Sequence, residues 1–306
     1  MSRGATNLDV SPKRSGQGQD PGGASPIIVL GAGRSGTKML RSLLVASPDM
    51  VCFPKEINYI WRHGNRSFAT DELPPDLARP EVARYIRRRF DRFARAHGGR
   101  RVVEKTCAST LRVDFVRAVF PHAVFVHLVR DGRAVAESAM RRWQTPNPVR
   151  YLIQKARWVP PLDVPYYAWR YLTYRLRRNR DTTSAYQSWG PRFEGMDAAV
   201  RTRSLVEVCG LQWLACVRAT SEAVSRLPPS QAVTIRYEDL VANPLEVGER
   251  LYDRLDMPFH PQSRDFARAE IHTGNLEKWQ QRLSAEDMDK LLPLIGDELA
   301  GLGYLE

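Results

Sequence analysis

The stretch from residue 26 to residue 44 constrains the fold of this chain more than any other part of the sequence. A short β-branched apolar run, Pro26-Ile-Ile-Val-Leu30, is followed at once by the glycine-rich Gly31-Ala-Gly-Arg-Ser-Gly-Thr-Lys38 and then by apolar residues at helical spacing. This pattern predicts a buried strand, a tight loop and a helix. Backbone N–H groups and the positive end of the helix dipole meet in such a loop, which is typical of phosphate binding.

Three further apolar runs predict strands, at residues 101–105, 123–129 and 232–236. Helical patterns accompany them over residues 132–142 and 204–227, and a last helix begins at Ser284 with a capping-box-like sequence. Apolar strands that alternate with helices predict an α/β fold, a three-layer sandwich around a central, mostly parallel sheet. We expect one domain over residues 26–306.

The glycine-rich loop satisfies two phosphate-binding patterns only in part. Gly31 and Gly36 have the spacing of a Walker A loop, but Thr37-Lys38 stand in reverse order to the Lys and Ser/Thr that this loop requires. The pattern GxGxxG is met by the glycines at 31, 33 and 36, but no acidic residue at the end of a recognisable second strand accompanies it. A tight turn that merely needs glycine is the remaining alternative.

The charge and the cysteines narrow the class of protein. The chain of 306 residues carries 46 Lys and Arg against 34 Asp and Glu, a net charge of +12, which favours a polyanionic partner. Its 4 cysteines contain no CxxC pair, so we expect neither a zinc site, nor any other metal, nor a disulfide framework. We expect a flexible tail over residues 1–25, no secretory signal, no membrane span and a cytoplasmic location.

One segment concentrates base and aromatic side chains. Residues 141–203 hold 13 Lys and Arg, 4 Asp and Glu and 11 of the 28 aromatics. Three interpretations stay open: a lid over an acceptor site, a solvated face or subunit contact, and a surface for nucleic acid or membrane. We favour the lid, an insertion within the single domain.

Four motifs together resemble the sulfotransferases that use 3′-phosphoadenosine 5′-phosphosulfate (PAPS), and within them the heparan sulfate-type and bacterial enzymes. The motifs are the loop at 31–38, Val126-His-Leu-Val-Arg-Asp-Gly-Arg-Ala-Val-Ala-Glu-Ser138, Ile235-Arg-Tyr-Glu-Asp-Leu-Val-Ala-Asn-Pro244 and Gly274-Asn-Leu-Glu-Lys-Trp279. The resemblance implies the P-loop-like sulfotransferase fold and a site for PAPS.

The resemblance also implies which residues bind the donor. Arg130 and Ser138 match the motif that binds the 3′-phosphate, and the third motif is expected to brace a loop through residues 237–239. Lys278 and Trp279 match the segment that closes over the nucleotide, although Trp279 is equally compatible with a place in the core. A local ion pair with Asp131 is the alternative for Arg130. The residues expected to bind the 5′-phosphosulfate are Gly33, Arg34, Ser35, Gly36, Thr37 and Lys38.

Two further segments resemble the catalytic parts of the same enzymes. In Pro54-Lys-Glu-Ile-Asn-Tyr-Ile-Trp61, Glu56 matches the general base, and in Val102-Val-Glu-Lys-Thr106, Lys105 matches an active-site lysine that stabilises charge or orients Glu56. Arg34 would neutralise charge that develops on the leaving group. An ion pair between Glu56 and Lys55 is the structural alternative, and His63 is the second candidate for the base.

The sequence thus predicts transfer of a sulfuryl group from PAPS to a hydroxyl, or less favourably an amine. The acceptor is expected to be a small molecule, glycan or lipid, possibly anionic, and the protein a monomer or homodimer that does not bind nucleic acid. Two alternatives stay open: an ATP-dependent P-loop kinase, and a nucleic-acid-binding module that uses residues 141–203.

Overall fold

The structure, a computed structural model, describes residues 25–145, 189–274 and 276–305. The predicted tail over residues 1–25 lies outside the described residues except for Ser25. The predicted lid over 141–203 is described only at its two ends, 141–145 and 189–203.

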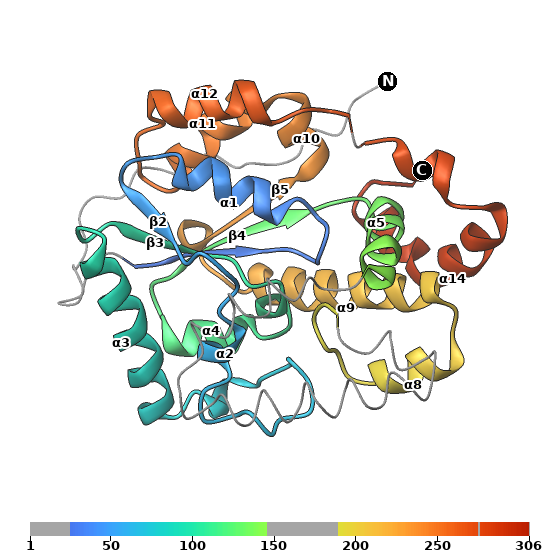
Figure 1. The fold of residues 1–306 in the computed structure, drawn as a ribbon, viewed down its shortest axis with the longest axis horizontal. Helices are drawn as coiled ribbons and strands as arrows, with labels where there is room; N and C mark the ends of the chain where they lie inside the picture. The colour runs from blue at the N-terminus through green and yellow to red at the C-terminus, as the bar shows by residue number, and fades with distance from the viewer. Residues whose placement is uncertain (1–24, 146–188, 275, 306) are drawn as a thin grey trace.

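The described strands form a five-stranded sheet in the order β2-β3-β1-β4-β5, and every neighbouring pair is parallel (Figure 1). The strands are β1 (Ile27–Leu30), β2 (Met50–Cys52), β3 (Arg101–Glu104), β4 (Val124–Val129) and β5 (Ala232–Arg236). The four predicted strands are confirmed to within one residue at either end. β2 was not predicted, because three residues are too few to show a pattern of alternation.

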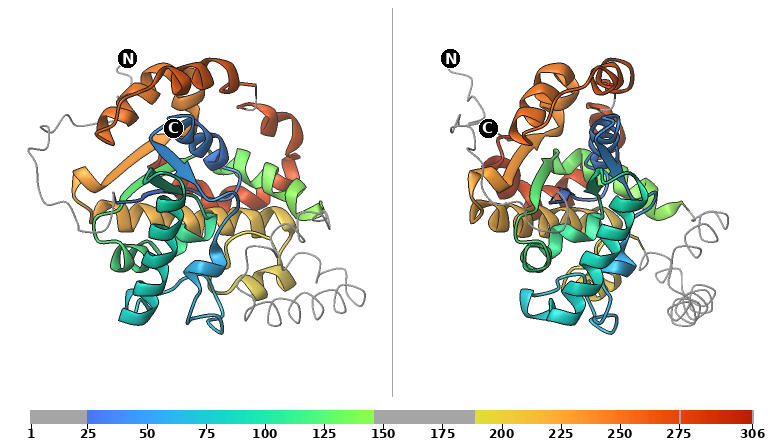
Figure 2. Two further views of the ribbon diagram at one scale, coloured as in Figure 1. Left: turned by 60° about the vertical axis from the view of Figure 1, so that its left-hand side comes forward. Right: turned by 90° about the vertical axis from the view of Figure 1, so that its left-hand side faces the viewer.

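Side chains of β1 alternate between the two faces of the sheet and build a core on each. Ile27 and Val29 belong to one cluster of buried side chains, while Ile28 and Leu30 belong to another. Both clusters are apolar because the central strands of a parallel sheet are covered on both sides. Figure 2 shows helices above and below the sheet, so the predicted three-layer α/β sandwich is confirmed.

The helices divide into three groups. The first layer contains α1 (Thr37–Val45), α10 (Tyr237–Ala242), α11 (Pro244–Arg254) and α12 (Pro261–Glu270). The second contains α2 (Asn58–Trp61), α3 (Pro80–Ala96), α4 (Val113–Val119) and the end of α9 (Leu205–Ser225). A third cluster joins α9 to α5 (Gly132–Gln144), α8 (Met196–Thr202) and α14 (Ala285–Gly301), and α13 (Lys278–Arg282) lies beside α5. Short 3₁₀ turns are η1 (Pro75–Leu77), η2 (Cys107–Leu111) and η5 (Pro229–Gln231).

The helix boundaries follow from the local sequence. Ser284 and Asp287 form the capping box that the sequence predicts at the start of α14, and Ser204 with Glu207 forms another at the start of α9. α3, α11 and α12 begin with proline, whose fixed φ and missing N–H suit the first turn of a helix.

Candidate functional site

All of the described strands are parallel, so their carboxyl ends lie at one edge of the sheet, and the predicted site residues follow these ends. The glycine-rich loop leaves β1, Lys105 leaves β3 and Arg130 leaves β4. Glu56 follows β2 after a short turn, and Tyr237 follows β5 directly. In open α/β sheets this edge is where ligands bind, and here it gathers segments from across the chain.

The glycine-rich loop has the backbone of an anion-binding site. Gly36, the residue before α1, has φ 87°, and Arg34 has φ 78°, so both lie in the left-handed region. No side chain of the described residues caps α1, and the first N–H groups of a helix have no acceptor within the helix. The hydroxyl of Ser35 is buried and has no hydrogen-bond partner in the described part of the chain. An incoming phosphate would supply the missing acceptors.

Gly36 is required by its surroundings as well as by its backbone. A Cβ atom at this position would lie 2.5 Å from Cδ2 and 2.6 Å from Cε2 of the Tyr237 ring. The ring therefore packs directly under the loop. The third predicted motif, which contains Tyr237, braces the loop as expected.

Substitution of Gly36 with alanine is expected to lower the free energy of unfolding by about 2 kcal/mol, because the left-handed backbone and the contact with Tyr237 both oppose a Cβ. Denaturant unfolding measures this. Gly296→Ala is the matched control, since Gly296 lies within α14 and a Cβ added there would meet no atom within 4 Å beyond its own helix backbone and chain neighbours. That control is expected to be neutral or slightly stabilising. Equal stability of Gly36→Ala and wild type would contradict the steric argument.

Three groups of the described residues contact Arg130 at the end of β4. Its Nη1 donates to the carbonyl oxygen of Arg34 at 3.0 Å, its guanidinium lies 4.3 Å from the centre of the Tyr237 ring, and its own carbonyl accepts from Trp213 Nε1 at 3.1 Å. Asp131 pairs with Arg133 at 2.7 Å. The local ion pair considered for Arg130 is therefore not what the structure shows, and its guanidinium is directed at the loop.

Positive charge is concentrated around Arg34. Its Nε donates to Ser138 Oγ at 3.0 Å, which joins two of the predicted donor-binding residues. Burial and the like charges of Arg141, Arg130 and Arg142 lower the pKa of Arg34. Like charges raise the free energy of this arrangement, and a bound anion would offset the repulsion.

Glu56 and Lys105 form an ion pair at the same edge. The side chain of Glu56 is 36% exposed and that of Lys105 is 10% exposed, so the carboxylate is accessible while the ammonium lies behind it. Burial opposes the charge of Lys105, but the charge of Glu56 and its hydrogen bond favour that charge, and the pKa of Lys105 is raised. Of the two roles predicted for Lys105, stabilising charge and orienting Glu56, the ion pair is compatible with the second.

Cys107 completes this group, although no sequence pattern singled it out as functional. Its Sγ lies 3.5 Å from Glu56 Oε1 and 4.0 Å from the hydroxyl of Thr37 at the start of α1. Burial raises the pKa of Cys107 to about 12, so the group is a neutral thiol near neutral pH. It links the loop to the Glu56 side of the site.

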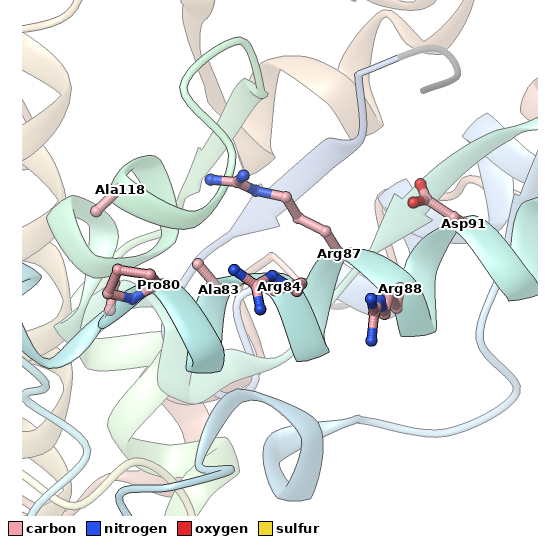
Figure 3. A pocket seen from close by; sticks show the side chains of 8 residues that line it. Pro80, Ala83, Arg84, Arg87, Arg88, Asp91 and Ala118 are labelled. Carbon is pink, nitrogen blue, oxygen red and sulfur yellow. The ribbon is translucent and has the colours of Figure 1, made fainter. Parts of the chain in front are cut away.

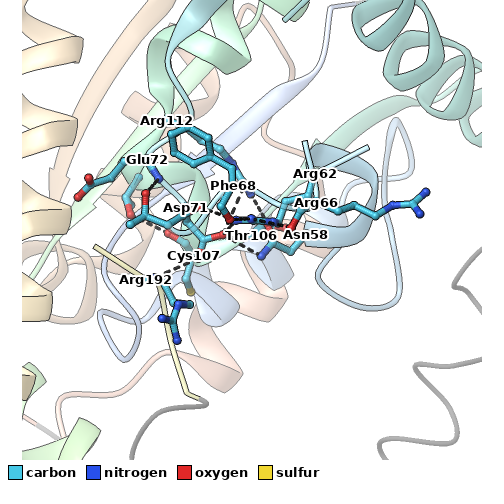
Figure 4. Close-up of polar contacts among 12 residues, drawn as sticks. Asn58, Arg62, Arg66, Phe68, Asp71, Glu72, Thr106, Cys107, Arg112 and Arg192 are labelled. Carbon is cyan, nitrogen blue, oxygen red and sulfur yellow. Dashed lines mark hydrogen bonds and ion pairs between the residues drawn. The ribbon is translucent and has the colours of Figure 1, made fainter. Parts of the chain in front are cut away.

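A buried ionic network supports the segment that carries Glu56 (Figure 4). Asp71 pairs with Arg62 at 3.0 Å and Arg112 at 3.7 Å, and accepts from the side chain of Asn58 and the backbone of Arg192. Burial would raise the pKa of Asp71, but Arg112 and the other donors hold it below its ordinary value. The network anchors α2 directly after Glu56.

The C-terminal motif lies against α5. Lys278 is exposed, and Trp279 is partly exposed, with its ring 4.3 Å from the guanidinium of Arg133. Trp279 is not among the buried core side chains of the described residues, so its alternative assignment to the core is wrong. Nearby, Glu238 accepts from the backbone N–H of Asp131 at 3.1 Å.

Two histidines that could be considered as bases lie elsewhere. His63 stacks on Tyr85 of α3, with ring centres 3.5 Å apart. His127 is buried within β4, where burial lowers its pKa to about 4. These placements favour Glu56 over His63 as the base.

Trp189 is a residue that sequence reasoning placed only in the general basic segment. A Cβ on Gly33 would lie 3.0 Å from its Cη2 atom, so the indole covers the loop. It is far from the loop in sequence and belongs to no motif, and only the three-dimensional contact identifies it.

Other surfaces carry none of the predicted site residues. Arg84, Arg87, Arg88 and Asp91 of α3 line a hollow beside Ala118 (Figure 3). Within the ranges that the structure describes, no group of three His, Cys, Asp or Glu side chains is arranged to hold a metal ion. The helices of these ranges are also too short or too polar for any to cross a membrane.

The family model of the sulfotransferase family matches residues 26–213 and 173–261 of the chain. Nodulation protein NoeE of Sinorhizobium fredii (strain NBRC 101917 / NGR234) is 22% identical over 291 residues, which cover 90% of this chain and 65% of NoeE. The chain therefore spans just under two thirds of the length of this relative.

Solved structures show the same fold. The sulfotransferase domain from the curacin biosynthetic pathway is 15% identical, with a TM-score of 0.53 over 90% of this chain and 98% of that domain. The corresponding domain from the Synechococcus PCC 7002 olefin synthase is 16% identical, with a TM-score of 0.53 over 92% of this chain and 98% of that domain. These likenesses show the fold, and the match to the family model, which covers most of the chain, shows that the chain belongs to the sulfotransferase family.

Proposed function

We propose that the protein transfers a sulfuryl group from PAPS to a hydroxyl, or less favourably an amine, with Glu56 as the general base. The observation that carries this proposal is the meeting of two groups at one sheet edge. Arg34, Ser138 and Arg130 form a connected set of cationic and hydroxyl groups, and the ion pair of Glu56 with Lys105 lies next to it through Cys107.

The residues at this edge fit a nucleotide with two phosphate positions. The uncapped start of α1 and the unpartnered hydroxyl of Ser35 suit the 5′-phosphosulfate. Arg130 and Ser138 suit the 3′-phosphate, because a guanidinium binds phosphate through two parallel hydrogen bonds. Lys278 and Trp279 would cover the nucleotide. The donor supplies the activated sulfuryl group, and no metal enters the proposal.

The protein's own contribution is positioning, charge neutralisation and removal of a proton. The exposed carboxylate of Glu56 accepts the proton of the acceptor hydroxyl. Lys105 pairs with that carboxylate and would hold it in place, and its positive charge would stabilise negative charge on the transferred group. Arg34 and Lys38 neutralise charge on the leaving phosphate side.

The acceptor proposed is a small molecule, glycan or lipid that bears a hydroxyl, whether it is neutral or anionic. The basic segment 141–203 supports this choice, since its arginines and aromatics suit a sugar face or an acidic group. We further propose a cytoplasmic monomer or homodimer. The family match supports the transferase over a P-loop kinase and over a nucleic-acid-binding module.

A transfer assay with labelled PAPS, paired with calorimetric titration of adenosine 3′,5′-bisphosphate (PAP) and AMP, tests the proposal. Binding of PAP well above that of AMP is expected, because only PAP carries the 3′-phosphate that Arg130 and Ser138 would bind. Equal binding of PAP and AMP would overturn the donor assignment. Magnesium-dependent binding of ATP in place of PAP would support the kinase instead.

Arg130→Ala is expected to weaken PAP binding by about 1.5–3 kcal/mol, roughly 10- to 150-fold, because a charge-assisted contact to phosphate is lost. AMP binding should change much less. Arg226→Ala is the matched control, since Arg226 is an exposed arginine that pairs with Asp114 and Glu222 on another surface. Unchanged PAP affinity in Arg130→Ala would remove its phosphate-binding role.

A further inference from the structure

Glu104 is a buried carboxyl group that the proposed mechanism does not use. It ends β3, is 1% exposed and lies one residue before Lys105. Its Oε1 accepts a hydrogen bond from the Thr106 hydroxyl at 2.5 Å, while its Oε2 has no hydrogen-bond partner among the described residues. An unpartnered buried carboxylate oxygen is costly, so its presence beside the catalytic pair needs a reason.

The hydrogen bond of Glu104 with Thr106 connects Glu104 to the backbone next to Glu56, the proposed base. The Thr106 hydroxyl donates its single proton to Glu104 and accepts from the backbone N–H of Ile57 at 3.1 Å. Ile57 is the residue after Glu56 and the one that precedes α2. A hydroxyl has one proton, so its donation to Glu104 leaves its lone pairs directed at Ile57.

We propose that Glu104 is a positioning residue for the base. Its carboxylate orients the Thr106 hydroxyl, and that hydroxyl fixes the peptide bond between Glu56 and Ile57. The inference rests on the proposed function of Glu56, which it deepens. A carboxylate accepts more strongly than a neutral acid, so the ionised form of Glu104 holds this chain of contacts most firmly.

The surroundings of Glu104 bring its ionisation into the neutral range. Burial raises its pKa to about 7, the Thr106 hydrogen bond and the charges of Arg112 and Lys105 act to lower it, and the charge of Glu56 acts to raise it. Arg112 also pairs with Asp71, so its positive charge acts on both carboxyl groups. Because the ionised form is the ordering one, turnover is expected to rise with pH through this range.

Amide hydrogen exchange at Ile57 tests the chain of contacts without any donor or acceptor. Thr106→Val removes the hydroxyl at nearly constant volume and is expected to lower the protection of the Ile57 amide about tenfold or more. Thr106→Ser keeps the hydroxyl and should retain most of the protection. Glu104→Gln, which also keeps its volume, should give an intermediate loss because the hydrogen bond becomes neutral.

Thr220→Val is the matched control, since Thr220 is a fully buried threonine whose hydroxyl donates to the carbonyl of Thr110 and does not contact the base. It should leave Ile57 protection unchanged. Wild-type protection of Ile57 in both Thr106→Val and Glu104→Gln would overturn the proposal, whatever the activity. If Thr106→Val does not fold, Glu104→Gln alone decides.

Kinetics separates this inference from the function on which it rests. Glu104→Gln is expected to lower kcat about tenfold with PAP affinity unchanged, and to remove the rise of kcat near pH 7. An active wild type with an unaltered kcat and pH profile in Glu104→Gln overturns the positioning role and leaves the transferase standing. A wild type that binds no PAP and transfers nothing from PAPS overturns the proposed function, while the exchange data still decide the contacts.

Discussion

Replacing Glu56 with glutamine is expected to lower kcat of PAPS-dependent transfer about 100-fold or more, because the amide cannot accept the proton of the acceptor. Glutamine retains the size of the side chain and its oxygen still faces Lys105. The contacts of Arg34 with Ser138 and of Arg130 with the loop, where we propose that PAP binds, do not involve this carboxylate. PAP affinity should therefore stay within about twofold of wild type.

The control for this substitution is Glu72→Gln, a partly buried carboxylate that accepts from the backbone N–H of Glu194 rather than from Lys105. It should leave kcat unchanged. Steady-state kinetics and PAP titration on both variants give the comparison. Full turnover by Glu56→Gln would show that Glu56 is not the base, and His63 would then be the next candidate.

Asp71→Ala is expected to lower the free energy of unfolding by about 3–5 kcal/mol. The side chain of Arg112 is 0% exposed and that of Arg62 is 10% exposed, and both face Asp71. Removing the carboxylate leaves two buried guanidinium groups without this counter-charge. Each then bears its desolvation cost with less compensation. Urea unfolding measures the difference.

Asp114→Ala is the matched control for Asp71→Ala, because Asp114 also pairs with an arginine but is 43% exposed. Its loss should cost less than about 1 kcal/mol. The pKa of Asp71 is held below its ordinary value of 3.8, so its contribution is present above that value and is lost as the pH falls through the lowered one. Equal losses in the two variants would show that burial does not strengthen the Asp71 network.

Much of the fold could be predicted because each strand of four residues or more is a separate apolar run in the sequence that ends in a recognisable loop or turn. The segment around β1 shows strand, loop and helix in one short stretch, and β4 leads into α5 in the same way. β2 was not predicted because its sequence, Met50-Val-Cys52, is no longer than the apolar clusters that occur by chance elsewhere in the chain. Its place in the sheet comes from pairing with β3, which no local pattern encodes.

The residues of the candidate site likewise fall into those that could be predicted from the sequence and those that could not. Arg34 and Arg130 could be located because each follows a predicted strand, and Glu56 because it stands in a segment that resembles the family. Asp71 and Arg112 could not, since polar residues between elements look like solvated loop, and only tertiary packing buries them together. The resemblance supplied roles, and the contacts then showed which of those residues meet.

The distribution of charge was also predicted only in part. Residues 141–203 stand out because their arginines alternate with aromatics, yet residues 79–101 carry nine arginines against Glu81 and Asp91. Most of this second run lies on an amphipathic helix. Its arginines alternate with the apolar residues Val82, Ile86 and Phe90, so the segment looks like an ordinary helix and its positive charge is easily overlooked in the sequence. In the structure most of this run lies on α3 (Figure 1), where Arg84, Arg88 and Arg92 are exposed.

Glu238 connects the segment that follows α14 to the backbone that follows β4. Its carboxylate accepts from the N–H of Asp131 and, at 2.7 Å, from the hydroxyl of Tyr304, while Arg133 donates to the Tyr304 carbonyl. Loss of the Tyr304 hydroxyl in Tyr304→Phe should therefore weaken the hold of Glu238 on the backbone after Arg130 while the sheet persists. By reciprocity, PAP bound at Arg130 should slow hydrogen exchange of the Asp131 amide, which makes that amide a label-free report of binding.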